Sequence, residues 1–295
     1  GYPVRGLLTT QGFTLLHIHS VHKDTIHFSS FPLIFPTLTM VFHDITKLDI
    51  KRSTFSTPHH LIALLAHLPR LENVKVEAAF SPDWPSSQVL PVPPEPPRSL
   101  KTVQLFLSNR YGDPWSCILD WIVQGPLTVR ALALHGLPSK SLLTFRTLLC
   151  TLGPTLHTLY LYPCYNVSSQ TDLSPHFGCL TQLRHLEICV DSLQHDPAHL
   201  DAYSALLDAL PREPAVLKIL TLHILYVGTF THLVSLDWVR FCAAARAHTR
   251  LRLLRFLADG RTPKDRAVLE ELRNRVAKDL AATVSVEVKW DEPLL

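Results

Sequence analysis

Short apolar triplets with the spacing apolar-x-x-apolar-x-apolar recur along the chain. Eight of them begin 26, 29, 29, 27, 27, 34 and 34 residues apart. They are Ile45-Leu48-Ile50, Leu71-Val74-Val76, Leu100-Val103-Leu105, Val129-Leu132-Leu134, Leu156-Leu159-Leu161, Leu183-Leu186-Ile188, Leu217-Leu220-Leu222 and Leu251-Leu254-Phe256. A weaker row, Phe13-Leu16-Ile18, precedes them, and a terminal strand is predicted through Val284, Val286 and Val288. Apolar residues two positions apart indicate strands that bury one face.

Between the triplets, apolar residues stand at i, i+3, i+4 and i+7, which indicates amphipathic helices of about three turns. These stripes are Leu61-Leu64-Leu65-Leu68, Trp115-Ile118-Leu119-Ile122, Phe145-Leu148-Leu149-Leu152 and Tyr203-Leu206-Leu207-Leu210. A polar residue before proline predicts helix starts at Thr57-Pro58 and Asp113-Pro114. Longer helices are predicted over about 231–247 and 263–280.

A strand followed by a helix, repeated at about this period, is typical of leucine-rich repeats. Right-handed crossovers place such strands in one parallel sheet with the helices outside. We therefore predict an α/β leucine-rich-repeat solenoid, a right-handed β-α superhelix with a curved sheet inside. The repeat domain is predicted over 41–295, with a C-terminal capping helix and strand at about 263–290. Residues 1–40 are predicted to form an irregular N-terminal cap or the remnant of one.

The segment 81–97, SPDWPSSQVLPVPPEPP, stands where a helix is expected. It contains seven prolines, and proline cannot sustain a helix interior. We expect an extended loop on the outer side or the rim. Its use as a docking peptide for a proline-binding domain stays open beside the simpler interpretation as an irregular connector.

Composition narrows the function classes. The chain is 46% hydrophobic with a net charge of +3, so a large core is expected, and nucleic acid or an anionic membrane is not expected as a partner. No apolar run approaches the roughly 18 residues of a membrane helix. The six cysteines contain no CxxC pair, which favours reduced thiols in an intracellular protein of the cytoplasm or nucleus. The only Met is Met40, so a leader or a domain before Gly1 is an open possibility.

Motifs of catalysis and cofactor binding are not found: GxSxG, HExxH, GxxxxGK[ST], GxGxxG and the EF-hand loop do not occur. No cofactor, metal or catalytic residue is therefore predicted, although His17 and His19 share a predicted strand face and His59-His60 begins a helix. An enzyme with a site on the inner face or in rim loops remains an alternative.

The inner face of the sheet is the expected binding surface, because strand side chains alternate. Counted from the first residue of each triplet, positions +4 and +6 point to that face. The predicted partner-binding residues there are Lys75, Phe106, His135, Tyr160, Tyr162, Glu187 and His223. Clustered tyrosines often anchor a protein partner. The alternative is that these tyrosines only pack on neighbouring strands.

The block VFHDITKLDIKRSTFSTPHHLIALLAHLPRLENVKVEAAF (41–80) resembles the repeat region of F-box-like proteins of mushroom-forming fungi. LLCTLGPTLHTLYL (148–161) and DLSPHFGCLTQLRHLEICV (172–190) are similar to later rows of that family. In the family an F-box recruits a ubiquitin ligase scaffold and the repeats hold the target. No F-box helices are predicted in 1–40, so the chain is expected to be a fragment or a paralogue without that module.

The resemblance implies a non-enzymatic protein-recognition module, similar to the target-binding repeats of an F-box-type ubiquitin ligase receptor. A ligase adaptor is expected as a partner only if an F-box lies upstream. The alternative is a sensor or scaffold repeat domain of a larger intracellular receptor.

Overall fold

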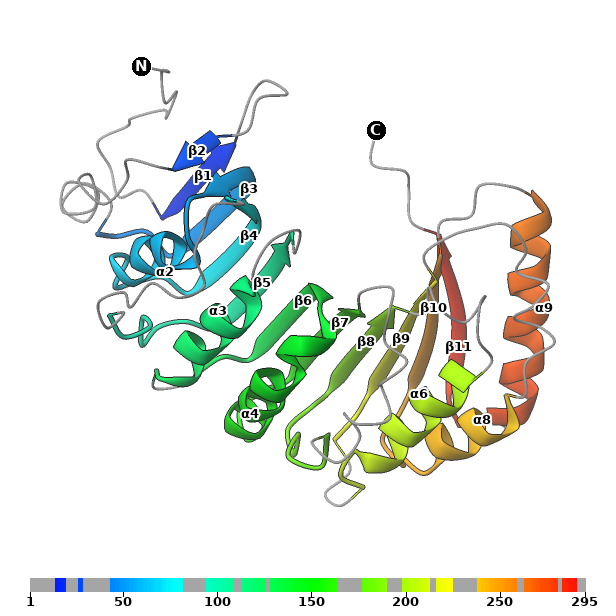
Figure 1. Ribbon diagram of the computed structural model, residues 1–295. Helices are drawn as coiled ribbons and strands as arrows, with labels where there is room; N and C mark the ends of the chain where they lie inside the picture. Colours follow the sequence, from blue (N-terminus) through cyan, green and yellow to red (C-terminus); the bar gives the residue numbers. More distant parts are fainter. Residues whose placement is uncertain are drawn as a thin grey trace. The chain divides into compact units, whose positions relative to one another are not determined.

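The computed structural model (Figure 1) has an α/β fold in which every strand pairing of the described chain is parallel. It describes residues 14–19, 26–28, 43–81, 94–108, 113–125, 128–163, 177–189, 198–212, 216–224, 238–258, 263–280 and 283–290. The chain divides into two compact units, Gly1–Thr151 (unit 1) and Leu152–Leu295 (unit 2). This division falls inside the region 41–295 that the sequence predicts as one repeat domain.

Unit 1 contains a parallel sheet with strand order β1-β3-β4-β5-β6, and β2 also pairs with β3. Its strands are β1 (Leu15–His19), β2 (Ile26–Phe28), β3 (Lys47–Phe55), β4 (Asn73–Phe80), β5 (Thr102–Leu107) and β6 (Ala131–Leu137). Its helices are α2 (Pro58–Ala66), α3 (Pro114–Val123), the 3-10 turn η2 (Ser139–Ser141) and α4 (Leu142–Leu152) at the boundary. In Figure 1, α2, α3 and α4 lie on one face of β3 to β6.

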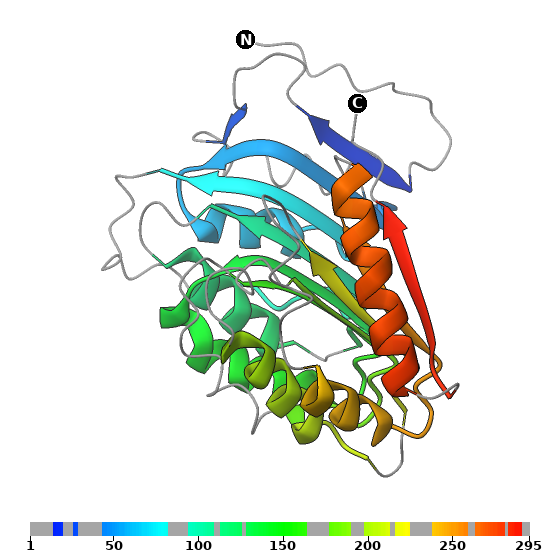
Figure 2. The ribbon, with the colours of Figure 1, turned by 90° about the vertical axis from the view of Figure 1, so that its right-hand side faces the viewer.

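Unit 2 repeats the arrangement with strand order β7-β8-β9-β10-β11. The strands are β7 (Thr158–Pro163), β8 (His185–Cys189), β9 (Ile219–Ile224), β10 (Leu253–Ala258) and β11 (Ser285–Trp290). The helices are α6 (Ala198–Ala209), α8 (Val239–Arg246) and α9 (Pro263–Leu280). Helix α8 packs between α6 and α9, and α9 packs against β11, as Figure 2 shows.

The strand register pairs equivalent positions of successive triplets, as the periodicity predicts. In unit 1 the ladder runs from Leu48 to Val74, Val103 and Leu132. In unit 2 it runs from Leu159 to Leu186, Leu220, Leu254 and Val286. The weaker N-terminal row is confirmed at the positions described, because Leu16 pairs with Leu48 and Ile18 with Ile50.

The core lies between each sheet and its helices. All 24 residues of the eight triplets are buried, and so are the four helix stripes predicted from the sequence. The predicted N-caps are confirmed for α2 and α3: His60 N donates to Thr57 Oγ1 and Ser116 N donates to Asp113 Oδ1. These side chains satisfy amides that the first helical turn leaves without partners.

The predicted helix over 231–247 is only partly matched. Helix α8 begins at Val239 and has 8 residues, and 231–237 lie outside the described residues. Trp238 at its start is buried and makes edge-to-face contacts with Phe241 and Phe256. The indole thus belongs to the core between α8 and β10. Helix α9 has the predicted bounds.

The C-terminal end of the proline-rich segment packs on the helix side of unit 1. Pro96 and Pro97 are buried, and Trp121 Nε1 of α3 donates to Pro94 O at 2.6 Å. Residues 82–93 lie outside the described residues, so their use as a docking peptide stays a prediction. Residues 94–97 cover α3 where a helix of a regular repeat is expected.

Candidate functional site

The inner face is the sheet face opposite the helices, formed by positions +2, +4 and +6 of each row. The alternating burial along β5, where Val103, Leu105 and Leu107 are buried and the residues between them are partly exposed, shows how one strand serves both faces. A bulge after Ile50, with Arg52 at φ 49°, shifts the register of β3 so that Ser53 pairs with Ala78. The extra residue returns Ser53 and Phe55 to the core side.

In unit 1 the structure brings together three of the predicted residues. The Phe106 ring stacks on His135 with centroids 3.6 Å apart. Lys75 Nζ lies 5.7 Å from the centroid of the Phe106 ring, at cation-π distance. The three side chains come from the adjacent strands β4, β5 and β6. They form a partly exposed aromatic and cationic group that a partner can contact.

In unit 2 three further predicted residues form a hydrogen-bonded network. The Tyr162 hydroxyl donates to Glu187 Oε1. His223 Nδ1 lies 3.1 Å from the Tyr162 hydroxyl and 3.7 Å from Glu187 Oε1. The Tyr162 and His223 rings meet edge to face with centroids 5.4 Å apart. The hydroxyl therefore occupies the point at which the carboxylate and the imidazole converge.

A second contact pair lies beside this network. Tyr160 meets His185 edge to face at 5.3 Å between centroids, and His185 Nε2 lies 3.2 Å from Thr221 Oγ1. Burial raises the pKa of Tyr160, and the Glu187 carboxylate raises it further. Burial also lowers the pKa of His185, with a further contribution from Arg255. Both rings therefore favour their neutral forms near pH 7.

The far side of the unit 2 face ends in an ion pair. Arg255 Nε of β10 donates to Glu287 Oε1 of β11, its direct partner in the ladder. The ladder of position +4 thus presents Tyr160, Glu187, Thr221, Arg255 and Glu287 on five successive strands. These polar side chains do not contribute to the hydrophobic core, because the core leucines point to the other face of the sheet.

The predicted residues differ in accessibility. Glu187 is 7% exposed and His223 is 8% exposed, so both are buried. The other five, Tyr160, Tyr162, Lys75, Phe106 and His135, are partly exposed. Glu187 and His223 hold Tyr162 in place and offer little surface of their own, whereas the five partly exposed residues offer more contact surface. All seven remain candidate partner-binding residues.

Sequence reasoning missed His185 and Glu287 as members of this face. His185 stands at position +2, which the count of positions +4 and +6 leaves out, and Glu287 belongs to the terminal strand beyond the eight triplets. Extending the same count to position +2 and to the last strand finds both. His17 of β1 joins the face in unit 1, where its Nδ1 lies 3.4 Å from Asp49 Oδ2.

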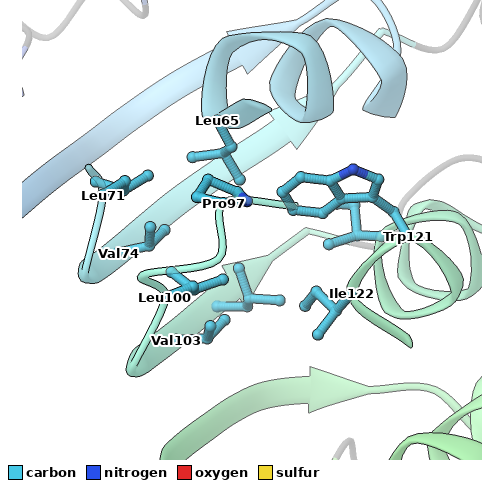
Figure 3. Close-up of a pocket in the computed structure, with 10 residues that line it drawn as sticks. Leu65, Leu71, Val74, Pro97, Leu100, Val103, Trp121 and Ile122 are labelled. Atoms are coloured by element: carbon cyan, nitrogen blue, oxygen red, sulfur yellow. The ribbon is translucent and has the colours of Figure 1, made fainter. Parts of the chain in front are cut away.

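The cavity in unit 1 is not a ligand site. It lies between α3 and the sheet, has a volume of about 10 Å³ and is lined only by apolar residues, among them Leu65, Val74 and Trp121 (Figure 3). A void of about this size holds at most one water, and an apolar lining offers that water no partners. It is a small packing void beside Pro97.

Cys117 of α3 approaches His59 of α2, with its Sγ 3.7 Å from His59 Nε2. This pair is not an activated thiolate. Burial raises the pKa of Cys117 to about 11, and Asp120 and Asp113 act in the same direction. Burial also lowers the pKa of His59.

Within the described part of the chain, no three His, Cys, Asp or Glu residues cluster as metal ligands. No helix of that part is long and apolar enough to cross a bilayer.

Comparison with known proteins adds no family assignment. No protein-family model matches the chain, and a search of the curated proteins finds no significant match.

Proposed function

We propose that the chain is a leucine-rich-repeat solenoid that binds a protein partner on its inner face. The observation that carries the proposal is the strand register. Equivalent positions of successive rows are direct neighbours: Val74 pairs with Val103 in unit 1, and Leu186 pairs with Leu220 in unit 2. Each row therefore adds its +4 and +6 side chains to two continuous columns within its unit, which gives a surface that suits an extended macromolecular partner.

A binding role is favoured over a catalytic one by the state of the polar groups. The Glu187 carboxylate, the Tyr162 hydroxyl and the His223 imidazole are engaged with one another, and the Cys117 thiol favours its protonated form. Partly exposed aromatic rings lie next to polar side chains in both units: Tyr160 beside His185 in unit 2, and Phe106 beside His135 in unit 1. Tyrosine and other aromatic residues supply much of the binding energy in protein interfaces.

The resemblance to fungal F-box-like proteins gives the proposal its cellular context. The repeats would hold the target of an F-box-type ubiquitin ligase receptor, and a ligase adaptor would be a partner of a full-length product that carries an F-box. Protein recognition by the inner face does not depend on that module.

The experiment is site-specific photo-crosslinking in the full-length protein expressed in its native cells. A benzophenone amino acid is placed at Tyr160 or His135 on the inner face, or at Leu143, which is 72% exposed on α4. The proposal expects the same partner protein to be crosslinked from Tyr160 and His135 and not from Leu143.

Tyr160→Ala combined with Tyr162→Ala should weaken capture by at least about tenfold, which corresponds to the loss of a hot spot. Crosslinking only from Leu143 would refute it.

A further inference from the structure

The strands of each unit begin at one edge of the sheet, which we call the amino edge. Within each unit, position +1 of a row lies there, and its carbonyl accepts amides of the next row. In unit 2, Arg184 O accepts from Lys218 N at 2.8 Å and from Ile219 N at 3.0 Å, and Lys218 O accepts from Arg252 N and Leu253 N. These bonds fix the backbone at the same place in each row, so the +1 side chains stand in a line along the edge.

That line is cationic in unit 2. Arg184, Lys218 and Arg252 occupy position +1 of three adjacent rows, and Arg250 stands two residues before Arg252. All four side chains are exposed, and none of them makes an ion pair in the described part of unit 2. Positions −1 to +2 of the five rows of this unit contain no Asp or Glu. Among the described residues, no carboxylate therefore neutralises the positive charge at this edge.

In unit 1, by contrast, cations at the same positions form ion pairs with carboxylates of the preceding row. Lys101 at +1 pairs with Glu72 at +1 of the preceding row at 2.8 Å. Arg70 at −1 pairs with Asp44 at −1 of the preceding row at 2.6 Å. The fold can thus accommodate cross-row ion pairs at this edge, but the three rows of unit 2 that begin at Leu183, Leu217 and Leu251 have only cations there.

We propose that the amino edge of unit 2, defined by Arg184, Lys218, Arg250 and Arg252, binds an Asp- and Glu-rich segment of a protein partner. Three adjacent rows span about 10 Å at a strand spacing of about 4.8 Å, which an extended peptide covers with about three residues at about 3.3 Å each. Arginine guanidinium groups bind carboxylates in a bidentate geometry. Carboxylates on alternate residues lie about 6.6 Å apart and successive rows about 4.8 Å apart, a difference that long Arg and Lys side chains can span.

A nucleic acid fits this edge less well. The cationic line is only three rows wide, and positions −1 to +2 in unit 2 offer no Phe, Tyr or Trp on which bases could stack. The net charge of the chain, +3, is also small for a surface that follows a phosphate backbone. The edge surface is separate from the inner face, so it extends the proposed function without resting on it.

A structural role of these cations is the competing explanation. The helices α6 and α8 end shortly before the rows that begin at Leu217 and Leu251, and cations near helix C-termini stabilise the helix dipole. That role predicts a change in thermal stability on charge removal and no effect on peptide binding. Stability is therefore measured beside binding for every variant.

The test is fluorescence anisotropy on the full chain at 50 mM salt, with a labelled 12-residue peptide of alternating Asp, Glu and Ser. The matched peptide has Asn and Gln in place of the acids. We expect binding of the acidic peptide only, a Kd at least about tenfold weaker for Arg184→Glu with Lys218→Glu, and an intermediate Kd for Arg184→Gln with Lys218→Gln. Lys140→Glu with Arg240→Glu changes the net charge equally on the helix side and should alter the Kd less than about twofold.

Equal affinity of wild type and the Arg184→Glu, Lys218→Glu variant would overturn the proposal, and so would a lack of binding to the acidic peptide. Tighter binding of a 12-base-pair duplex or of phosphatidylserine vesicles than of the peptide would overturn it in favour of those partners. Apart from the helix-side controls, the peptide assay changes only edge residues and the crosslinking experiment changes only inner-face residues, so failure of the edge proposal and failure of the inner-face proposal are distinguishable.

Discussion

Gly125 leaves no room for a side chain beside Pro96: a Cβ at Gly125 would lie 2.8 Å from Cγ of the proline ring. Pro96 is itself buried, and its ring is tied to the backbone, so it cannot swing away. The C-terminal end of α3 and the end of the proline-rich segment therefore fit together only because residue 125 is glycine.

Gly125→Ala is expected to lower the free energy of unfolding by about 1–3 kcal/mol, as overpacking does in well-packed regions. Urea denaturation followed by circular dichroism measures this. Pro96→Ala removes Cγ and Cδ, which would lie 2.8 and 3.2 Å from the new methyl group, and keeps Cβ at 2.9 Å, so the double variant should recover part of the loss. Strict additivity of the two changes would show that the contact does not determine stability.

The triplet pattern makes a second prediction, about the core. Leu222 is the third residue of its triplet and is fully buried, so Leu222→Ala should destabilise the chain by about 2–5 kcal/mol through lost burial and the cavity left behind. The matched control is Leu143→Ala at a leucine that is 72% exposed, where a change within about 0.5 kcal/mol is expected. Equal losses at both positions in thermal denaturation would contradict the assignment of the triplets to the core.

The periodicity predicted the parallel strands and their register well, because the apolar residues of every row pack under the helices in the same way. A leucine at the first, fourth or sixth place of a row can reach only the space under the helices, so spacing alone assigns strand, face and register. Val74 and Val103 are 29 residues apart in sequence, and their pairing follows directly from the count. The residue at which α8 begins was harder to predict from the sequence, because an apolar residue such as Trp238 fits the pattern whether it belongs to the helix or precedes it.

The inner face was harder to predict, because alternation says which way a side chain points and not what it touches. The count placed Tyr162 and Glu187 on one face, but the hydrogen bond between them joins position +6 of one row to position +4 of the next. Such diagonal contacts depend on rotamers and on side-chain length. The burial of Glu187 and His223 likewise depends on three-dimensional neighbours that the row count does not contain.

The Tyr162 hydroxyl gives a third prediction. It donates to Glu187, a buried carboxylate, so Tyr162→Phe leaves that carboxylate with one hydrogen bond fewer. Removing one partner of a buried charged group is expected to reduce the free energy of unfolding by about 1–3 kcal/mol. Tyr160→Phe on the same strand is the control, because no hydrogen bond of the Tyr160 hydroxyl is found among the described residues. A similar loss for both variants in urea denaturation would show that the network does not stabilise unit 2.

The buried histidines predict a fourth property, the pH dependence of stability. His248 is 2% exposed, and its Nε2 donates to Leu207 O over 2.9 Å. Burial lowers the pKa of His248, despite the opposing effect of that hydrogen bond. Its value in the unfolded chain is about 6.5. The unfolded state therefore binds the proton more readily, and stability falls as the pH drops below about 6.5.

Denaturation midpoints measured from pH 8 to pH 5 check this. His248→Gln retains an amide donor for Leu207 O and should flatten the fall, whose slope is at most about 1.4 kcal/mol per pH unit for one histidine. Leu143→Ala, at an exposed residue that does not titrate, should leave the slope as in the wild type. A steeper slope for His248→Gln, or stability that rises on acidification, would show that His248 takes up its proton in the folded state.

The cysteines allow a fifth prediction that bears on the choice between binding and catalysis. Burial raises the pKa of Cys117 and of Cys242 to about 11 each, whereas Cys150 is exposed. Since the thiolate is the nucleophile, at pH 8 iodoacetamide should label Cys150 at least about 100 times faster than the other two, as measured by peptide mass spectrometry over time. In denaturant the three rates should converge. Labelling of Cys117 within about tenfold of Cys150 would mean that His59 activates the thiol, and it would favour a catalytic role for the α2 and α3 surface.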